Sequence, residues 1–466
     1  MKKIYILIML VLAGVFAQAQ TSVWDGSRQL WNRGTGTQDN PFLIESAANL
    51  AYLSYMVGKG FDTQDLYFKL TTDIDLNGSE FQQWIPIGLA GSAYYEDGCE
   101  RNCLPTGVKA TDVMFKGHFD GDNHSISNIY INKESGAAGL FGVVTCNGTQ
   151  TVVENVFVTN GFVKGGSSGG IVGTCYTNST TEVLISRCWN GAEIEGTYAG
   201  GIVGEKADKI HNCYNVGTIH GSSSAGGIVG SSATEVLECY NNGAVTGDCY
   251  GGGIVGGDIR GNAFVGNCYN TGNISITGNG ISSSLPGIPV GGIVGMIWQG
   301  SHTISNCYNV GMVACETCEP GGVVGGFGGS GIVENAYYIV NCGGEGEGVV
   351  KTAEEMRDPA FVGVLNVGTN VWCADTLNHN DGYPILGANN LAVDEYAMQT
   401  LTVYPNPTSG RFTAEGTGVI SVYNTLGQMV LSKEIREKAT LELPRGMYFI
   451  RLAGEKGKRM TKIVVR

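Results

Sequence analysis

Charged residues and prolines are scarce in this sequence. Asp, Glu, Lys and Arg make up 15% of the 466 residues, whereas ordinary globular domains contain about 25%. Apolar residues still account for 42%, which is enough for a packed interior and excludes a disordered chain. The 11 prolines are too few for a collagen-like Gly-X-Y repeat. After residue 16 no apolar run reaches the roughly 18 residues that a membrane-spanning helix needs.

Basic residues are scarcest between residues 4 and 393. The chain has 28 Lys and Arg against 42 Asp and Glu, and 13 of the basic and 7 of the acidic residues lie outside this segment. The segment therefore keeps 15 basic and 35 acidic residues, a net charge of −20. Such a surface repels phosphates, so nucleic acid and anionic membrane surfaces are poor partners and no nucleic acid is expected, whereas calcium, basic peptides and neutral glycans remain open.

Glycine is in large excess, and much of it belongs to a repeat. The 73 glycines are about 16% of the chain, more than twice the usual share of about 7%. A Gly-Gly-Ile-Val-Gly motif and its variants alternate with a Cys-Tyr-Asn or Cys-Trp-Asn motif, and the shortest spacing is 26 residues. The first motif occupies residues 138–142, 169–173, 200–204, 226–230, 252–256, 291–295 and 321–325; the second occupies 188–190, 213–215, 239–241, 268–270 and 307–309.

The repeat predicts an all-β fold, a right-handed parallel β-helix (β-solenoid) with short helical caps. Each unit holds three short β-branched runs separated by Gly, Ser and Asn. Three such strands cannot bury their own apolar side, so the units must stack on one another about 4.8 Å apart. We expect Ile and Val of the glycine motif to form inward ladders, and the flanking glycines to allow backbone bends that other residues do not tolerate.

Two helices are expected to cover the ends of the stack. Residues 46–58 have helical spacing, with Ser46 as N-cap, and should cover the first coil. A second helix is expected between Thr352 and Asn366, followed by a last strand within residues 382–386. After Asn390 the glycine motifs cease, and alternating apolar runs joined by turns predict a small antiparallel β-sandwich.

The first residues have the pattern of an export signal. Lys2 and Lys3 precede an apolar run from Ile4 to Phe16, and Ala17-Gln18-Ala19 follows with the small-x-small pattern of a signal-peptidase site. Cleavage is expected between Ala19 and Gln20. We therefore expect an exported protein that is soluble or is attached to the cell by other means than a membrane-spanning helix.

Both parts of the chain resemble known families. The repeat resembles the GLUG repeat of secreted bacterial surface proteins. In the C-terminal residues, Tyr404-Pro405-Asn406-Pro407 and Gly446-Met447-Tyr448 resemble the type A sorting domain of the type IX secretion system. The resemblance implies a Bacteroidota-type protein that passes through the periplasm and is secreted or attached to the outer-membrane surface. It also implies the secretion machinery as partner, trimming of the tail and attachment to surface lipopolysaccharide. The matching sorting residues are Tyr404, Pro405, Asn406, Pro407, Gly427, Gly446, Tyr448, Lys462 and Arg466.

The expected domains are a signal peptide (1–19), an N-terminal cap with the first coils (20–137), the repeat solenoid (138–345), a C-terminal cap (346–390) and the sorting domain (391–466).

Two acidic clusters look like sites but are better explained as corners and turns. Residues 73–78, Asp-Ile-Asp-Leu-Asn-Gly, match the start of an EF-hand loop, but Trp84 stands where the bidentate Glu is required. Asp120 and Asp122, with His118 and His124, could do acid–base work, yet Asp-Gly-Asp-Asn is common turn chemistry. The sequence has no His-Glu-x-x-His zinc motif. We therefore predict no catalytic, cofactor or metal site.

The cysteines of the repeat recur at one position and should stack. They are expected to be buried thiols that act as small hydrophobic residues, with a disulfide ladder as the alternative. Disulfides are expected for the local pairs Cys99 with Cys103 and Cys315 with Cys318; a zinc site shared by the two pairs is disfavoured because a solenoid holds them far apart. The repeated cysteines are Cys188, Cys213, Cys239, Cys268 and Cys307.

An aromatic residue follows each of these cysteines. If this row, Trp189, Tyr214, Tyr240, Tyr269 and Tyr308, faces outward, it could be a platform on which glycans stack; packing in the core or along the flank is the favoured interpretation. The asparagines beside it predict a ladder at a corner of the coil.

The function predicted from all these features is that of a monomeric, adhesin-like or glycan-binding surface protein, whose ligand could be a glycan or a host protein. The alternative is a polysaccharide lyase or glycoside hydrolase on the same scaffold.

Overall fold

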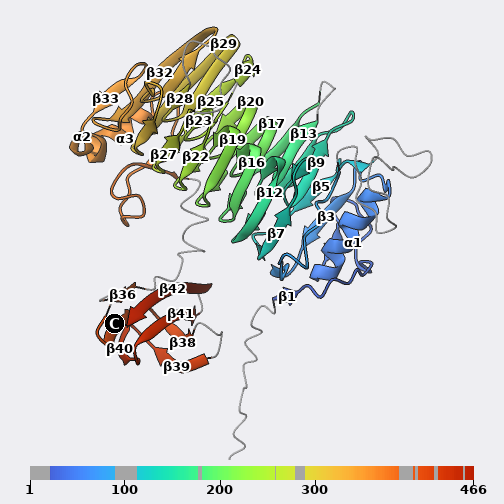
Figure 1. Ribbon diagram of the computed structural model, residues 1–466. Coiled ribbons are helices and arrows are strands. Elements are labelled where there is room, and N and C mark those ends of the chain that lie inside the picture. The colour runs from blue at the N-terminus through green and yellow to red at the C-terminus, as the bar shows by residue number, and fades with distance from the viewer. Residues whose placement is uncertain are drawn as a thin grey trace, which may run out of the picture. The chain divides into compact units, whose positions relative to one another are not determined.

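The computed structural model (Figure 1) divides into two compact units, residues 1–372 and 373–466. It describes residues 21–89, 113–176, 181–257, 259–278, 289–387, 402–404, 408–424, 429–454 and 457–465. The predicted signal cleavage site at Ala19 and Gln20 and the pair Cys99 and Cys103 lie outside the described residues. No helix in these ranges is long and apolar enough to cross a membrane.

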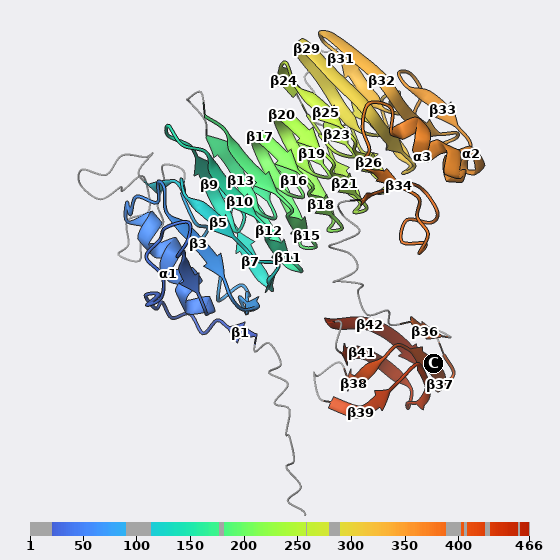
Figure 2. The ribbon, with the colours of Figure 1, turned by 180° about the vertical axis from the view of Figure 1, so that it is seen from behind.

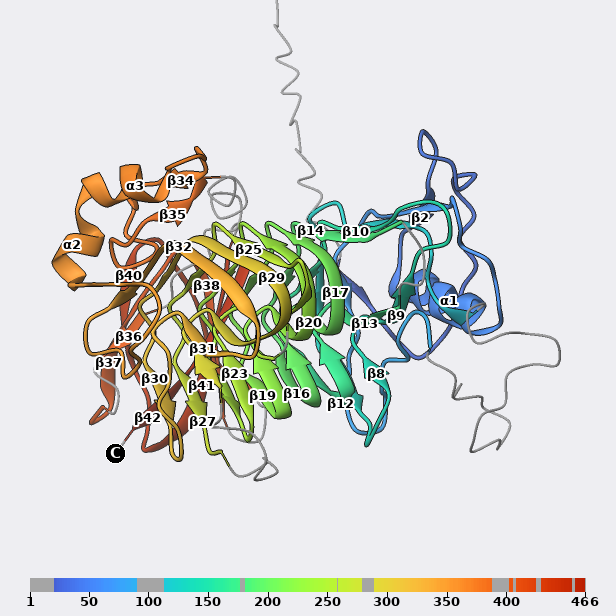
Figure 3. The ribbon, with the colours of Figure 1, turned by 90° about the horizontal axis from the view of Figure 1, so that it is seen from above.

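The first unit is a parallel β-solenoid, as the repeat predicted. Within the described residues it contains a 23-stranded and a 10-stranded sheet, and each strand pairs in parallel with the equivalent strand of the next coil. Figure 3 shows the coils as one stack. Because a parallel ladder uses the backbone groups on both sides of every inner strand, the short strands of one coil are stable only in the stack.

The larger sheet bends around the coil. Figure 2 shows one side of this sheet. Its strands are β1 (Ser22–Val23), β2 (Phe42–Ile44), β3 (Tyr67–Leu70), β4 (Ile74–Asp75), β5 (His118–Asp120), β6 (Ser125–Ser127), β9 (Phe141–Thr145), β10 (Thr151–Glu154), β11 (Phe157–Val158), β13 (Val172–Tyr176), β14 (Val183–Ser186), β15 (Trp189–Asn190), β17 (Val203–His211), β18 (Tyr214–Asn215), β20 (Val229–Leu237), β21 (Tyr240–Asn241), β24 (Ile259–Gly261), β25 (Phe264–Gly266), β26 (Tyr269–Asn270), β29 (Val294–Asn309), β31 (Val324–Phe327), β32 (Ser330–Ile339) and β33 (Val349–Lys351).

The second sheet forms the remaining side of each coil. Its strands are β7 (Ile129–Asn132), β8 (Ala137–Ala138), β12 (Gly161–Gly169), β16 (Glu193–Gly200), β19 (Ile219–Gly226), β22 (Val245–Gly247), β23 (Tyr250–Gly252), β27 (Ile274–Ile276), β28 (Val290–Gly291) and β30 (Val313–Cys315).

The interior is filled by the ladders that the glycine motif predicted. Ile202, Ile228 and Ile254 are fully buried, and the backbone N–H of Ile202 donates to the carbonyl of Ile228 at 2.9 Å. Side chains of every coil join one continuous apolar cluster. Each fully buried Ile or Val of this kind contributes about 1.5–3 kcal/mol through burial, so the repeat supplies the core that a single unit lacks.

The motif glycines are required for a different reason from the one expected. Gly201 and Gly227 do not have positive φ angles, so the expectation of a special backbone bend is wrong. A Cβ on Gly227 would lie 2.1 Å from the carbonyl oxygen of Gly253 and 2.3 Å from Cγ of Asn241. Gly201 has the same surroundings, with Gly227 and Asn215. These positions accept only glycine because the next coil and a buried asparagine approach so closely.

A left-handed residue precedes each cysteine of the second motif. Asn212 and Asn267 have φ angles of 54° and 53°, but Arg187 and Glu238 occupy the same position with φ of 51° and 54°. Asparagine adopts this conformation at a lower energetic cost than other side chains with a Cβ. Asn306 completes the set before Cys307, and Asn155 and Asn335 have the same conformation before Val156 and Ala336.

Replacing Glu238 with asparagine should therefore stabilise the protein, by about 0.5–1 kcal/mol. The new carboxamide oxygen can still accept from Nδ2 of Asn212, which now donates to Glu238 Oε2 at 2.7 Å. Urea unfolding curves measure the change, and Asn267→Glu is the converse control that should destabilise by a similar amount. An unchanged or lower midpoint for Glu238→Asn would contradict this explanation.

Helices cover both ends of the stack. At the first end, α1 (Ala47–Gly58) starts at Ser46, whose side chain accepts from the N–H of Asn49 as predicted. At the other end the expected single helix is wrong: α2 (Ala353–Arg357) and α3 (Pro359–Leu365) are separate. Pro359 explains the break, because the residue before a proline, here Asp358, is pushed out of helical geometry; its ψ is 131°.

The second unit contains the antiparallel sandwich expected from the tail. Its described core joins Phe412 and Leu441 of one sheet to Ile420, Val422 and Ile450 of the other. The two sheets are β36-β37-β40 and β39-β38-β41-β42. The strands are β36 (Thr402–Tyr404), β37 (Arg411–Glu415), β38 (Gly418–Asn424), β39 (Met429–Ile435), β40 (Lys438–Glu442), β41 (Gly446–Gly454) and β42 (Gly457–Val465); the short strands β34 (Trp372–Cys373) and β35 (Ile385–Leu386) precede them in the chain.

Candidate functional site

The EF-hand-like string forms a strand and corner whose carboxylates bind the next coil. Asp73 Oδ1 accepts from the N–H of Ser125 at 2.8 Å and lies 3.3 Å from Nδ1 of His124. Asp75 Oδ1 accepts from the N–H of Asn77 at 2.7 Å and from Nδ2 of Asn128 at 2.8 Å. In the described part of the chain no group of three or more His, Cys, Asp or Glu side chains could hold a metal ion.

The Asp120 and Asp122 pair is a turn, as the simpler interpretation predicted. Asp120 accepts from the N–H of Asp122 at 2.8 Å, and Nζ of Lys69 lies 3.0 Å from Asp122 Oδ1. His118 instead stacks on Tyr67 with ring centroids 4.2 Å apart, and burial lowers its pKa. Because His118 stacks on Tyr67 and His124 contacts Asp73, the described contacts pair neither histidine with Asp120 or Asp122.

The aromatic row is buried and its rings stack on one another. Tyr214, Tyr240 and Tyr269 are 9%, 6% and 3% exposed, and their ring centroids are 4.8 and 4.7 Å apart with nearly parallel planes. Burial raises the pKa of the Tyr240 hydroxyl well above its usual value. A sugar would need a free ring face for stacking, and here neighbouring rings occupy the faces. The flank-packing interpretation is therefore confirmed.

The C-terminal cap packs against the end of this row. The Trp372 ring lies 5.5 Å from that of Tyr308 and 6.0 Å from that of Tyr269. Phe361 of α3 contacts Tyr337 at 5.0 Å. The row thus anchors the cap on the flank of the solenoid, which is a structural role.

The asparagine ladder is a buried hydrogen-bond chain, as predicted. Nδ2 of Asn215 donates to Oδ1 of Asn241, and Nδ2 of Asn241 donates to Oδ1 of Asn270, both at 2.8 Å. Asn241 also closes its own turn, since it donates to the carbonyl of Gly243 and accepts from its N–H. Every polar atom of the Asn241 carboxamide is therefore paired inside the fold.

Asn241→Ala should cost about 2–4 kcal/mol of unfolding free energy, because it removes these bonds and leaves buried groups unpaired. The matched control is Asn242→Ala: this neighbouring side chain is exposed and accepts only from Thr271 Oγ1. The control should change stability by less than about 0.5 kcal/mol. Chemical unfolding of both variants measures the difference, and equal effects would rule out the ladder as a stabilising element.

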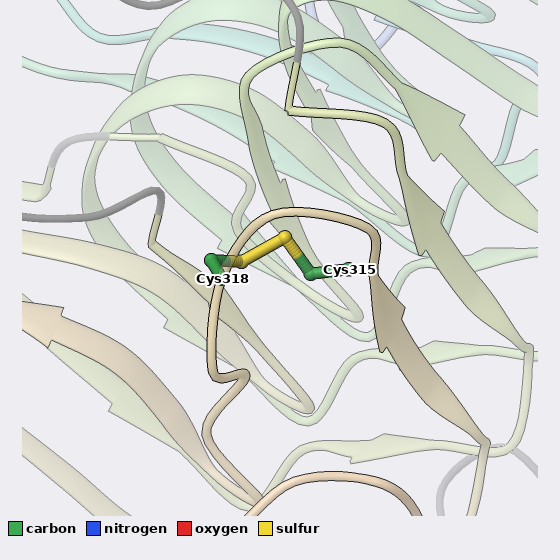
Figure 4. Close-up of a disulfide and its surroundings, with 2 residues drawn as sticks. All are labelled: Cys315 and Cys318. Atoms are coloured by element: carbon green, nitrogen blue, oxygen red, sulfur yellow. A yellow bond between two sulfur atoms is a disulfide. The ribbon is translucent and has the colours of Figure 1, made fainter. Parts of the chain in front are cut away.

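The five repeated cysteines are buried free thiols. The N–H groups of Cys188 and Cys213 each point at the sulfur of the cysteine in the next coil, at 3.4 Å. Burial raises the pKa of Cys188 and Cys239 well above the usual value. Cys315 and Cys318 form a disulfide in the turn after β30 (Figure 4).

Native alkylation should distinguish these thiols from the exposed Cys373. Iodoacetamide should modify Cys373 within minutes and leave Cys188, Cys213, Cys239, Cys268 and Cys307 unmodified until the protein is unfolded, because the reagent cannot reach a fully buried sulfur. Peptide mass spectrometry measures the labelling at each position. Rapid native labelling of any ladder thiol would contradict the buried arrangement.

The sorting residues are distributed over the second unit. Tyr404 ends β36 and donates to Glu415, and Gly446 begins β41. Tyr448 is buried in the core of the sandwich, and the backbone of Lys462 pairs with Phe449. Pro405, Asn406, Pro407, Gly427 and Arg466 lie outside the described residues.

The outer face of the second sheet was not singled out from the sequence. In β7 and β22, and in the first part of β12, β16 and β19, buried and more exposed residues alternate. Figure 1 shows these strands side by side. Lys164 and Glu195 form an ion pair of 2.7 Å across two coils. One row of this face consists of Asn132, Lys164, Glu195, His220 and Thr246, which are all at least partly exposed.

A family comparison identifies the tail. Residues 402–466 match the secretion system C-terminal sorting domain. The protein is therefore directed to the cell surface or the extracellular medium, and the secretion machinery recognises it. The sorting domain covers the whole described sandwich from β36 to β42.

Two curated relatives match about 170 to 180 residues of this chain. A proposed glycine-rich membrane protein of Evansella cellulosilytica is 30% identical over 179 residues, 38% of this chain and 17% of the relative. Halomucin of Haloquadratum walsbyi is 29% identical over 171 residues, 37% of this chain and 2% of the relative. The chain thus spans less than a fifth of the length of either relative.

A solved structure shares the solenoid fold. It is the crystal structure of a proposed immunoglobulin A1 protease from Bacteroides ovatus, with a TM-score of 0.51 and 25% sequence identity. The similarity covers 76% of this chain and 95% of that one.

Proposed function

We propose that this protein is an adhesin-like or glycan-binding surface protein, whose solenoid binds a ligand without chemical turnover. The observation that carries the proposal is the outer face of the second sheet, where polar side chains repeat from coil to coil and are at least partly exposed. A regular face of this kind offers many weak contacts to an extended ligand. The sorting domain, which brings the solenoid to the surface, supports the same proposal.

Several features of export belong to this proposal. The repeat resembles the GLUG repeat of secreted surface proteins, the signal peptide is cleaved between Ala19 and Gln20, and the source is of the Bacteroidota type. The mature protein is a monomer that loses its tail and is attached to surface lipopolysaccharide or released. N-terminal sequencing and intact-mass measurement of the exported protein test both cleavage events.

A polysaccharide screen tests the binding role. Purified exported protein is incubated with host and plant polysaccharides, and both retention and new reducing or unsaturated ends are measured. We expect retention of at least one polysaccharide without new ends. New ends would instead support the alternative, a polysaccharide lyase or glycoside hydrolase on the same scaffold.

Peptidase activity is the second candidate, because the structural relative is named as a proposed immunoglobulin A1 protease. The described residues argue against it in this chain. The two histidines that contact carboxylates are His124, with Asp73, and His211, with Glu235 at 2.6 Å. The thiol of Cys213 donates to the backbone carbonyl of His211 at 3.3 Å and not to its ring. His220 Nδ1 lies 3.1 Å from Thr246 Oγ1, but no described carboxylate orients this ring. The described contacts therefore assemble no carboxylate, histidine and nucleophile in sequence. Incubation with immunoglobulin A1 and electrophoresis of the chains tests this candidate directly.

A further inference from the structure

Two aromatic side chains pack together on an outer edge of the solenoid, where its second sheet begins, and a third belongs to a neighbouring loop. Tyr130 of β7 and Phe162 of β12 are register partners in adjacent coils, and their ring centroids are 5.8 Å apart with planes tilted by 39°. Both are only partly buried. Phe81 belongs to the preceding coil and is 99% exposed.

The loop that carries Phe81 is held against β7. Ser79 and Gln82 pair with each other through two backbone hydrogen bonds of 3.0 and 3.1 Å. On either side of this pair, the N–H of Gly78 donates to the carbonyl of Asn128 at 2.9 Å, and the N–H of Trp84 donates to the carbonyl of Tyr130 at 2.8 Å. Phe81 therefore stands at the tip of a short loop fixed beside Tyr130.

The side chains around these rings are polar and mostly acidic or neutral. Asn132 is exposed, and its N–H donates to Gln83 Oε1 at 2.9 Å. Glu193, the register partner of Phe162, is exposed. Two cations are nearby: Lys164 is paired with Glu195, and Lys133 is followed by the exposed Glu134, while burial lowers the Lys133 pKa to about 8. The edge thus offers amide and carboxylate groups beside aromatic rings, while its charge repels anionic ligands.

We propose that Phe81, Tyr130 and Phe162 form a binding strip for a neutral polysaccharide chain. The apolar C–H faces of sugar rings pack on aromatic rings, and their hydroxyls bond to amides and carboxylates such as Asn132, Gln83 and Glu193. Rings on three successive coils suit an extended chain of several sugars rather than a single one. This inference rests on the proposed binding function and gives that function a site and a ligand class.

The test uses the exported protein and affinity electrophoresis in gels that contain one polysaccharide each. The neutral probes are mannan, cellulose derivatives and starch; the anionic probes are polygalacturonate and heparin. We expect wild-type protein to bind a neutral probe, and the Phe81→Ala, Phe162→Ala double variant to bind it at least about tenfold more weakly. Tyr176→Ala removes an aromatic side chain that is 43% exposed on the other sheet and should leave binding within about twofold.

The single variant Phe81→Ala guards against a folding artefact. Its side chain is 99% exposed, so its removal cannot unfold the protein, and a severalfold loss of binding must come from the ligand contact. Unchanged binding by the double variant would overturn the strip while the binding function survives. Preference for an anionic probe would overturn the ligand class, and no binding to any polysaccharide would overturn both the strip and glycan binding.

Discussion

Deletion of residues 402–466 should abolish surface display and leave the protein in the periplasm. The sorting domain is the signal that the secretion machinery recognises, and its described strands pair only with one another. Its apolar core is also separate from that of the solenoid. We therefore expect a folded solenoid and a loss of at least about tenfold in surface protein. Cell fractionation with immunoblotting measures the location, and circular dichroism of the truncated protein measures the fold.

The matched control for this deletion is a full-length variant with a surface change in the solenoid, such as Asn242→Ala, which should be exported normally. Intact-mass measurement then examines the exported wild-type protein. We expect the tail to be missing from the surface form. Surface protein that still carries the peptide ending at Arg466 would show that the tail is a permanent module, and normal display of the truncated protein would show that export uses another signal.

Gly227→Ala should prevent stable folding of the solenoid. The added Cβ would lie 2.1 Å from the carbonyl oxygen of Gly253, and no flexible side chain can yield there because the atom belongs to the next coil's backbone. The clash can be relieved only if the two coils separate. Asn241 would also have to move, because its Cγ lies 2.3 Å from the same added Cβ. We expect a loss of at least about 4 kcal/mol, measured by urea unfolding or seen as insoluble protein.

Gly363→Ala is the matched control, since the same substitution there meets nothing within 4 Å. Gly363 lies inside α3, where alanine is favoured over glycine by about 0.5–1 kcal/mol. The control should therefore be slightly more stable than the wild type. Similar destabilisation of both variants would contradict the claim that contact between coils is what requires glycine at residue 227.

The repeat made the fold predictable because its period and its apolar positions allow only one way of burying a core. The asparagine ladder and the Ser46 cap follow from the same local chemistry. The role of the motif glycines was not predictable, since a close approach between coils is a property of the stack and not of one unit. Gly227 shows this, because the atoms that exclude a Cβ are 14 and 26 residues away in the sequence.

The orientation of the aromatic row could not be decided from alternation alone. A left-handed residue such as Asn212, with φ of 54°, precedes each cysteine and resets the alternation of inward and outward side chains. The strip of Phe81, Tyr130 and Phe162 was missed for a related reason. These residues are 49 and 32 positions apart, in coils of unequal length, so only the register of the stacked strands brings them to one edge.

The most direct test of a binding solenoid is to measure ligand and product in one experiment. Exported protein is mixed with a neutral polysaccharide in one sample and with immunoglobulin A1 in another. Size-exclusion chromatography isolates any complex that forms. After prolonged incubation the polysaccharide or the immunoglobulin is recovered and its mass is measured. We predict a stable complex with the polysaccharide, and both partners recovered at their original mass. Shortened polysaccharide or cleaved immunoglobulin chains would contradict the account and identify the protein as an enzyme.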